Sequence, residues 1–74
     1  MKVILRNLQP TLPLNIDFTG FDVTPISVSV QPLKSQTIET GMPLLELRKI
    51  SGVATALGAG FLSISAQGGL QVLN

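Results

Sequence analysis

The sequence contains no cysteine, histidine, tryptophan or tyrosine, and its charged side chains are limited to five Lys or Arg and four Asp or Glu in 74 residues. Most covalent and acid–base catalysis uses imidazole, thiolate or converging carboxylates, and transition metals are held mainly by the same groups. The lack of cysteine excludes disulfides. We therefore expect no enzyme activity, and we predict no catalytic, cofactor-binding or metal-binding residue and no small-molecule substrate.

The few candidates for chemistry have simpler interpretations. Asp17 and Asp22 flank a predicted loop, but a calcium site needs more oxygen ligands than two carboxylates provide. We interpret them as the solvated end of a hairpin. The Gly58-Ala59-Gly60 segment lacks the lysine and the hydroxyl group of a phosphate-binding loop, so no nucleotide site is expected there.

The size and composition of the chain predict association with other chains. A domain of this length buries only about 60% of the surface that its unfolded chain exposes, and small domains usually gain stability from disulfides, metals or oligomerisation. This chain has no cysteine for a disulfide, and no cysteine or histidine for a structural zinc site. The sequence is 45% hydrophobic and only 12% charged, which leaves little polar surface to cover a monomer. We expect a homo-oligomer, docking on a larger assembly, or contact with a membrane.

The charge pattern does not favour nucleic-acid binding. The net charge is +1, the basic residues are scattered, and only Arg48 and Lys49 are adjacent. Three phenylalanines are the only aromatic residues available for stacking on bases. The amino-terminal apolar run is interrupted at Arg6 and Asn7, so we do not interpret it as a signal peptide.

The first half of the chain has the periodicity of β-strands. Apolar residues are concentrated, or alternate with polar ones, in segments 2–8, 14–19, 26–31 and 35–40. Each of the three segments that connect them contains Pro or Gly, which favour turns. We predict that Ile26, Val28 and Val30 share one buried face and that Ile38 points inward. Strands spaced so closely predict a small meander or barrel-like domain.

The second half contains one predicted helix. Segment 43–50 fits a helix or a strand, and both interpretations stay open. Ser51 is suited to cap a short helix that ends at Gly60, where a left-handed residue is expected. A last strand follows over 61–65, with Phe61 or Leu62 returning to the core. The predicted fold class is thus mainly β with one short helix, in a single domain over residues 1–67.

Residues 68–74 are predicted to form a flexible carboxy-terminal arm. Gly68-Gly69 provides a hinge, and Leu70, Val72 and Leu73 form a short apolar strip. Two interpretations remain open for this strip. It is either a frayed terminus or an arm that adds an edge strand to a neighbouring subunit.

The uncharged region from Ser51 onward raises the alternative of a membrane-active protein. Residues 50–66 are nearly apolar enough for a span, as in a holin-like or fusion-peptide-like protein. This stretch is at the lower limit of length, is diluted by serine and threonine, and contains Gly58 and Gly60, which favour a break. Membrane insertion is therefore the second hypothesis.

Three segments together resemble small virion proteins of tailed bacteriophages. They are the strand Lys2-Val3-Ile4-Leu5-Arg6-Asn7-Leu8, the central Val28-Ser29-Val30-Gln31-Pro32 before a polar hairpin, and the ending from Ala56 to Ile64. The resemblance implies a structural role as a decoration, cement or minor capsid protein. Its implied partners are further copies of the chain, the major capsid protein or another virion protein, and its implied location is the capsid. The uncharged region after Ser51 favours burial between subunits.

Overall fold

The computed structural model describes residues 1–67 and 72–73. The elements, in chain order, are β1 (Lys2–Asn7), β2 (Leu14–Asp17), β3 (Val23–Thr24), β4 (Ser27–Val30), β5 (Ser35–Thr40), α1 (Leu44–Leu47), α2 (Ser51–Gly58), β6 (Leu62–Ala66) and β7 (Val72–Leu73). They form two antiparallel sheets and two short helices, so the predicted mainly-β class is confirmed.

The first strand of the chain is the central strand of the larger sheet. This sheet has five strands in the order β3-β5-β1-β6-β7, and β1 pairs with β5 on one side (Val3 opposite Ile38) and with β6 on the other (Leu5 opposite Ile64). The smaller sheet pairs β2 with β4. The described strands do not close into a barrel, and their order is not that of a simple meander, because β2 and β4 pair apart from the larger sheet.

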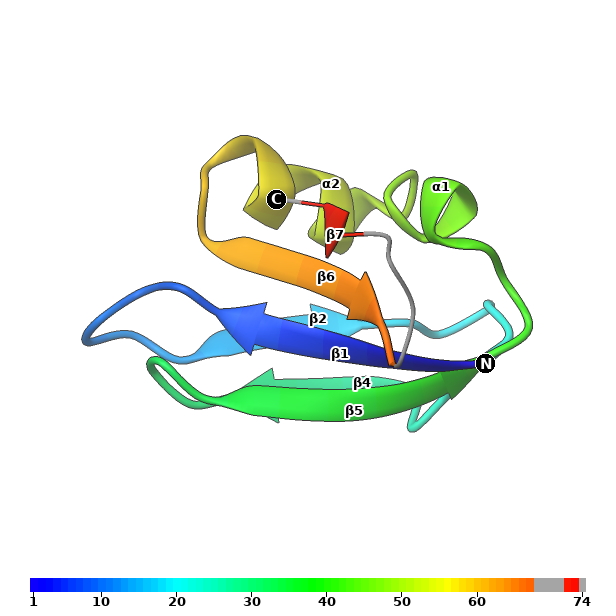
Figure 1. Ribbon diagram of the computed structural model, residues 1–74, viewed down its shortest axis with the longest axis horizontal. Helices are drawn as coiled ribbons and strands as arrows, with labels where there is room; N and C mark the ends of the chain where they lie inside the picture. Colours follow the sequence, from blue (N-terminus) through cyan, green and yellow to red (C-terminus); the bar gives the residue numbers. More distant parts are fainter. Residues whose placement is uncertain (68–71, 74) are drawn as a thin grey trace.

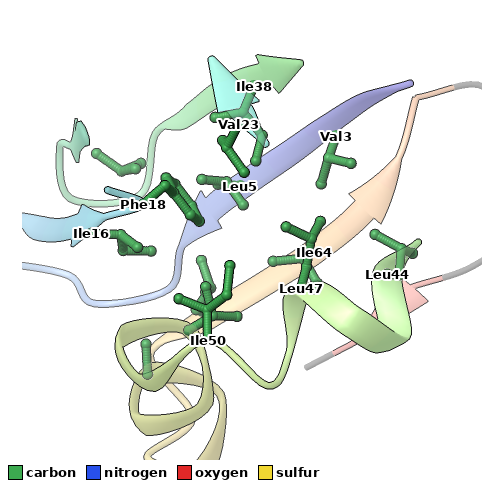
Figure 2. Packing of buried hydrophobic residues seen from close by; sticks show 14 residues of the cluster. Val3, Leu5, Ile16, Phe18, Val23, Ile38, Leu44, Leu47, Ile50 and Ile64 are labelled. Carbon is green, nitrogen blue, oxygen red and sulfur yellow. The ribbon is translucent and has the colours of Figure 1, made fainter. Parts of the chain in front are cut away.

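One continuous core lies between the larger sheet, the smaller sheet and the helices. Alternation along β1 buries Val3 and Leu5, as period-two burial requires. Figure 2 shows the side chains that meet there from the sheets, the intervening turn and the helices: Val3, Leu5, Ile16, Phe18, Val23, Ile38, Leu44, Leu47, Ile50 and Ile64. Both helices contact β6, and α2 also contacts β2 (Figure 1).

The segment left open between helix and strand forms the one-turn helix α1. Pro43 precedes it in an extended conformation, and Leu44 and Leu47 point into the core. Ile50, again extended, separates this turn from α2. The chain therefore has a second helix beyond the one that we predicted, because the extended backbone of Ile50 separates α1 from α2.

The predicted helix is present, but its predicted cap is wrong. Ile50, not Ser51, is the N-cap residue of α2, and no side chain bonds to its first backbone N–H groups. Ser51 already belongs to the helix and is exposed. The helix ends at Gly58, two residues before the predicted end. The left-handed conformation predicted for Gly60 is confirmed, since Gly60 has φ +78° and its N–H donates to the Leu57 carbonyl oxygen.

The predicted core face of the third strand is wrong at Ile26. Val30 is fully buried and Val28 is half-buried, but the Ile26 side chain is 58% exposed. The reason is that β4 begins at Ser27, so Ile26 lies in the preceding bend and does not take part in the alternation. At the start of β6, Leu62 is the residue that returns to the core, while Phe61 stays exposed.

The predicted arm lies largely outside the described residues, since 68–71 and 74 are not among them. Its two described residues form β7, which pairs with β6 of the same chain at Ile64 opposite Leu73 and Ser65 opposite Val72. Whether the arm serves a neighbouring subunit stays a prediction.

Candidate interaction surfaces at the two ends of the molecule

The two aspartates singled out in the sequence each stabilise a local turn. The Asp17 carboxylate accepts hydrogen bonds from the Thr19 N–H at 2.9 Å and the Thr19 hydroxyl at 2.6 Å, and these bonds lower the pKa of Asp17. Asp22 Oδ2 accepts from the Gly41 N–H at 3.1 Å. Within residues 1–67 and 72–73, no three potential metal-ligating side chains come together.

A buried asparagine organises the end of the molecule opposite the N-terminus. We call this the loop end, and it consists of segments 8–13, 31–34 and 59–61 (Figure 1). Asn7, fully buried at the end of β1, donates from Nδ2 to the carbonyl oxygens of Leu12 (2.8 Å) and Val30 (2.9 Å). Its Oδ1 accepts from the Gln9 N–H at 2.9 Å. Both N–H groups of the amide donate and its oxygen accepts, so these bonds connect the loops to the central strand.

Sequence analysis missed Asn7 as a structural residue. It occupies the third inward position after Val3 and Leu5 in an alternating strand, where an apolar residue is expected. A polar residue in such a position is the signal that a buried hydrogen-bond network exists.

The backbone also joins the three segments of the loop end. The Asn7 N–H donates to the Lys34 carbonyl oxygen at 3.0 Å, and the Leu8 N–H donates to that of Phe61 at 2.8 Å. On this frame, Leu12, Leu33 and Phe61 leave between 43% and 60% of their surface exposed. Leu33 has a left-handed backbone (φ 59°), which is uncommon for a residue other than glycine.

Hydrogen bonds also organise the opposite end, around Thr40. We call this the turn end, and it consists of Met1 and segments 17–26 and 39–43. The buried Thr40 hydroxyl donates to the Asp22 carbonyl oxygen at 2.6 Å and accepts from the Met42 N–H at 2.9 Å. Met1, Phe21 and Ile26 leave about half of their surface exposed here. Apolar side chains therefore face solvent at both ends of the molecule.

The exposed apolar side chains are unevenly distributed over the described surface. Six of the seven large ones belong to the two ends, and the seventh, Leu45, lies in α1. The outer face of the larger sheet is different: Ile4, itself half-buried, stands opposite Thr37 on β5 and Ser65 on β6. Single exposed apolar residues are ordinary, but grouped ones mark contact surfaces. The ends are therefore the candidate interaction surfaces.

The proposed membrane segment is divided between two elements of the core. Residues 50–66 comprise Ile50, α2, a connecting loop and β6, and Ile50, Val53, Leu62 and Ile64 are buried. In the part of the chain that the structure describes, no helix has the length and apolar character needed to cross a bilayer. No protein-family model, curated protein or solved structure matches this sequence.

Proposed function

We propose that the chain is a non-enzymatic structural protein of a tailed-phage virion. It assembles on or within the capsid in a decoration, cement or minor capsid role, and its partners are further copies of itself, the major capsid protein or another virion protein. The observation that supports an assembly role most strongly is the pair of apolar ends, each fixed by its own hydrogen-bond network. The phage setting rests on the sequence resemblance.

The fixed backbone at each end is what a contact surface needs. Loops held by a buried asparagine and a buried threonine lose little further entropy when a partner binds. Exposed side chains such as Leu12 and Ile26 are then presented in a defined arrangement. Burying apolar surface gains about 25 cal/mol per Å², so even partial coverage of one end favours association. Repetition of such a contact around a symmetric shell multiplies its effect.

Insertion of residues 50–66 into a membrane is the less favoured function. It would remove Val53, Leu62 and Ile64 from the core and would separate β6 from β1. Each large buried aliphatic side chain contributes roughly 1.5–3 kcal/mol to folding, so the domain would have to unfold first. No contact in the described structure favours that transition.

Particle fractionation tests the proposal. Lysates of cells in which the phage gene is expressed with its neighbouring structural genes are separated on a density gradient, and fractions are probed with an antibody to the chain. We expect the protein in the particle fraction at a fixed ratio to the major capsid protein, resistant to a high-salt wash. Recovery in the free-protein fraction, or in membranes that release it only with detergent, would contradict the proposal.

A further inference from the structure

The charges of the two ends are opposite. Segments 8–13, 31–34 and 59–61 of the loop end contain Lys34 and no acidic residue, and Arg6 lies beside them near the end of β1. Segments 17–26 and 39–43 of the turn end contain Asp17, Asp22 and Glu39 and no basic residue, and Met1 adds one positive charge, its N-terminal ammonium group.

Ion pairs and hydrogen bonds within the chain do not cancel the opposite charges of the two ends. Glu39 forms an ion pair with the N-terminal ammonium group of Met1 at 3.6 Å and stands opposite Lys2 across the strand pair, so its charge is offset. Asp17 and Asp22 accept hydrogen bonds from Thr19 and Gly41, and neither makes an ion pair within the described part of the chain. Within the described residues, two carboxylates of the turn end and the two cations of the loop end therefore make no ion pair.

Together, the charges and the apolar side chains match one end of the molecule to the other end of a second copy. We propose that the chain associates with itself head to tail, with the loop end of one copy docked on the turn end of the next. In this arrangement Arg6 and Lys34 face Asp17 and Asp22 around the exposed apolar groups. Opposite charge at the rim fixes orientation, and apolar burial provides most of the affinity.

Pairing of like ends is disfavoured by the same charges. A two-fold contact between two loop ends would bring Arg6 and Lys34 of one copy close to the same cations of the other copy. A two-fold contact between two turn ends would bring the carboxylates of Asp17 and Asp22 close together in the same way. Unlike ends have no such repulsion. The two ends lie along the longest axis of the molecule, and the perpendicular extents of 27 and 19 Å limit the contact to at most about 500 Å² on each copy. The total of about 1,000 Å² is at the lower limit of a specific interface, so the contact is expected to be weak unless it is repeated.

A head-to-tail contact is heterologous, so it generates a ring if the rotation between copies closes and an open chain if it does not. The biological meaning of this contact rests on the proposed virion role, because a virion ring or shell is built by repeating one contact between copies. The contact itself is a property of the chain and is tested without particles.

Two variants, each with one end blocked, test the inference. Leu12→Glu places a carboxylate on the loop end, and Ile26→Lys places a cation on the turn end; both side chains are exposed, so both variants should fold. The matched controls are Ser29→Glu and Thr37→Lys, which make the same charge changes at exposed strand positions outside the ends. Circular dichroism and thermal melting first establish that all four fold like wild type.

Sedimentation velocity then measures association. We expect wild type and both controls to associate, each blocked variant to weaken association at least tenfold, and an equimolar mixture of the two blocked variants to form a discrete dimer of about twice 7.8 kDa. The dimer forms because the mixture contains one unmodified loop end and one unmodified turn end, and it should weaken as salt is raised.

Three results would overturn the inference. They are a wild-type chain that stays monomeric at several hundred micromolar, a mixture that is no more associated than its components, or association that only one of the blocked variants affects. Failure of the proposed virion role is separate, since it would appear as head-to-tail association in solution without incorporation into particles.

Discussion

Asn7 Nδ2 donates to the Val30 carbonyl oxygen at 2.9 Å, which joins the central strand of the larger sheet to the last residue of β4 in the smaller one. Both residues are fully buried, and no buried side-chain nitrogen or oxygen atom among the described residues lacks a hydrogen-bond partner. The same amide holds Leu12 in the loop end, so one side chain couples the packing of the two sheets to the shape of a candidate interaction surface.

Replacing Asn7 by leucine should destabilise the fold strongly. The change keeps the volume of the side chain but leaves the Val30 carbonyl oxygen, the Leu12 carbonyl oxygen and the Gln9 N–H without their partner. The buried Val30 carbonyl oxygen alone should cost about 1–3 kcal/mol, and the two part-buried groups at Leu12 and Gln9 should cost less, so we expect a total loss of about 2–4 kcal/mol in the free energy of unfolding. Urea denaturation measures it, with Asn15→Ala on the exposed side of β2 as the control, expected within about 0.5 kcal/mol of wild type. A stability of Asn7→Leu equal to that of the control would refute this role.

Aspartate substitutions along segment 26–30 should follow the burial of the structure and not the predicted alternation. Val30→Asp puts an unpaired charge at a fully buried position and should abolish folding. Ile26→Asp and Ser29→Asp lie at exposed positions and should fold normally. Far-ultraviolet circular dichroism and solubility compare the three variants. An unfolded Ile26→Asp variant would show that Ile26 belongs to the core after all.

Gly41→Ala should weaken the turn end modestly. A Cβ atom at this position would lie 2.6 Å from Asp22 Oδ2, so the carboxylate must rotate away and lose its bond to the Gly41 N–H. Loss of one exposed hydrogen bond is expected to cost about 0.5–1.5 kcal/mol. A double-mutant cycle with Asp22→Ala checks the mechanism by thermal or urea unfolding, because the cost of Gly41→Ala should largely disappear once the carboxylate is gone. Equal costs in both backgrounds would show that the clash lies elsewhere.

Thr19→Ala should raise the pKa of Asp17 toward its ordinary value of 3.8. The hydroxyl of Thr19 is the main cause of the lowered pKa, and the backbone N–H of the same residue is the second. A lowered pKa in the folded state contributes stability above the pKa of the unfolded state, and that stability is lost as the pH falls through the folded pKa. The variant should therefore lose stability at neutral pH and match wild type in strong acid. A proton NMR titration of the Asp17 side chain checks the shift, and an unchanged pKa would exclude the hydroxyl as its cause.

Local patterns were sufficient to predict most of the strands. The alternation in Lys2–Asn7 and Ser35–Thr40, and the left-handed Gly60 that follows α2, reflect interactions between near neighbours in the sequence. The strand order was not predictable in this way, because β1 pairs with β5 and with β6, which lie more than 25 residues further along the chain. Pairing over such distances is decided by how apolar faces fit together, which one sequence does not specify.

The candidate surfaces were harder to predict than the elements. Ile26 follows the same alternation as Val28 and Val30, so the sequence predicts that it is buried with them. Its exposure became clear only from the structure, in which β4 begins at Ser27. Asn7 lies inside the predicted strand 2–8, where its inward position signals a buried hydrogen bond, but its partners could not be predicted because Leu12 lies in a loop and Val30 in another sheet. The low charge and the absence of stabilising cysteines did predict that the chain would associate, and this remains a prediction to be measured.

Sedimentation equilibrium of the wild-type chain at micromolar to several hundred micromolar concentration tests the central claim most directly, namely that the apolar ends are contact surfaces between protein chains. The account predicts a weight-average mass that rises above 7.8 kDa with concentration while the circular dichroism stays that of a folded β protein. A single 7.8 kDa species over the whole range, with cooperative melting well above room temperature, would contradict it.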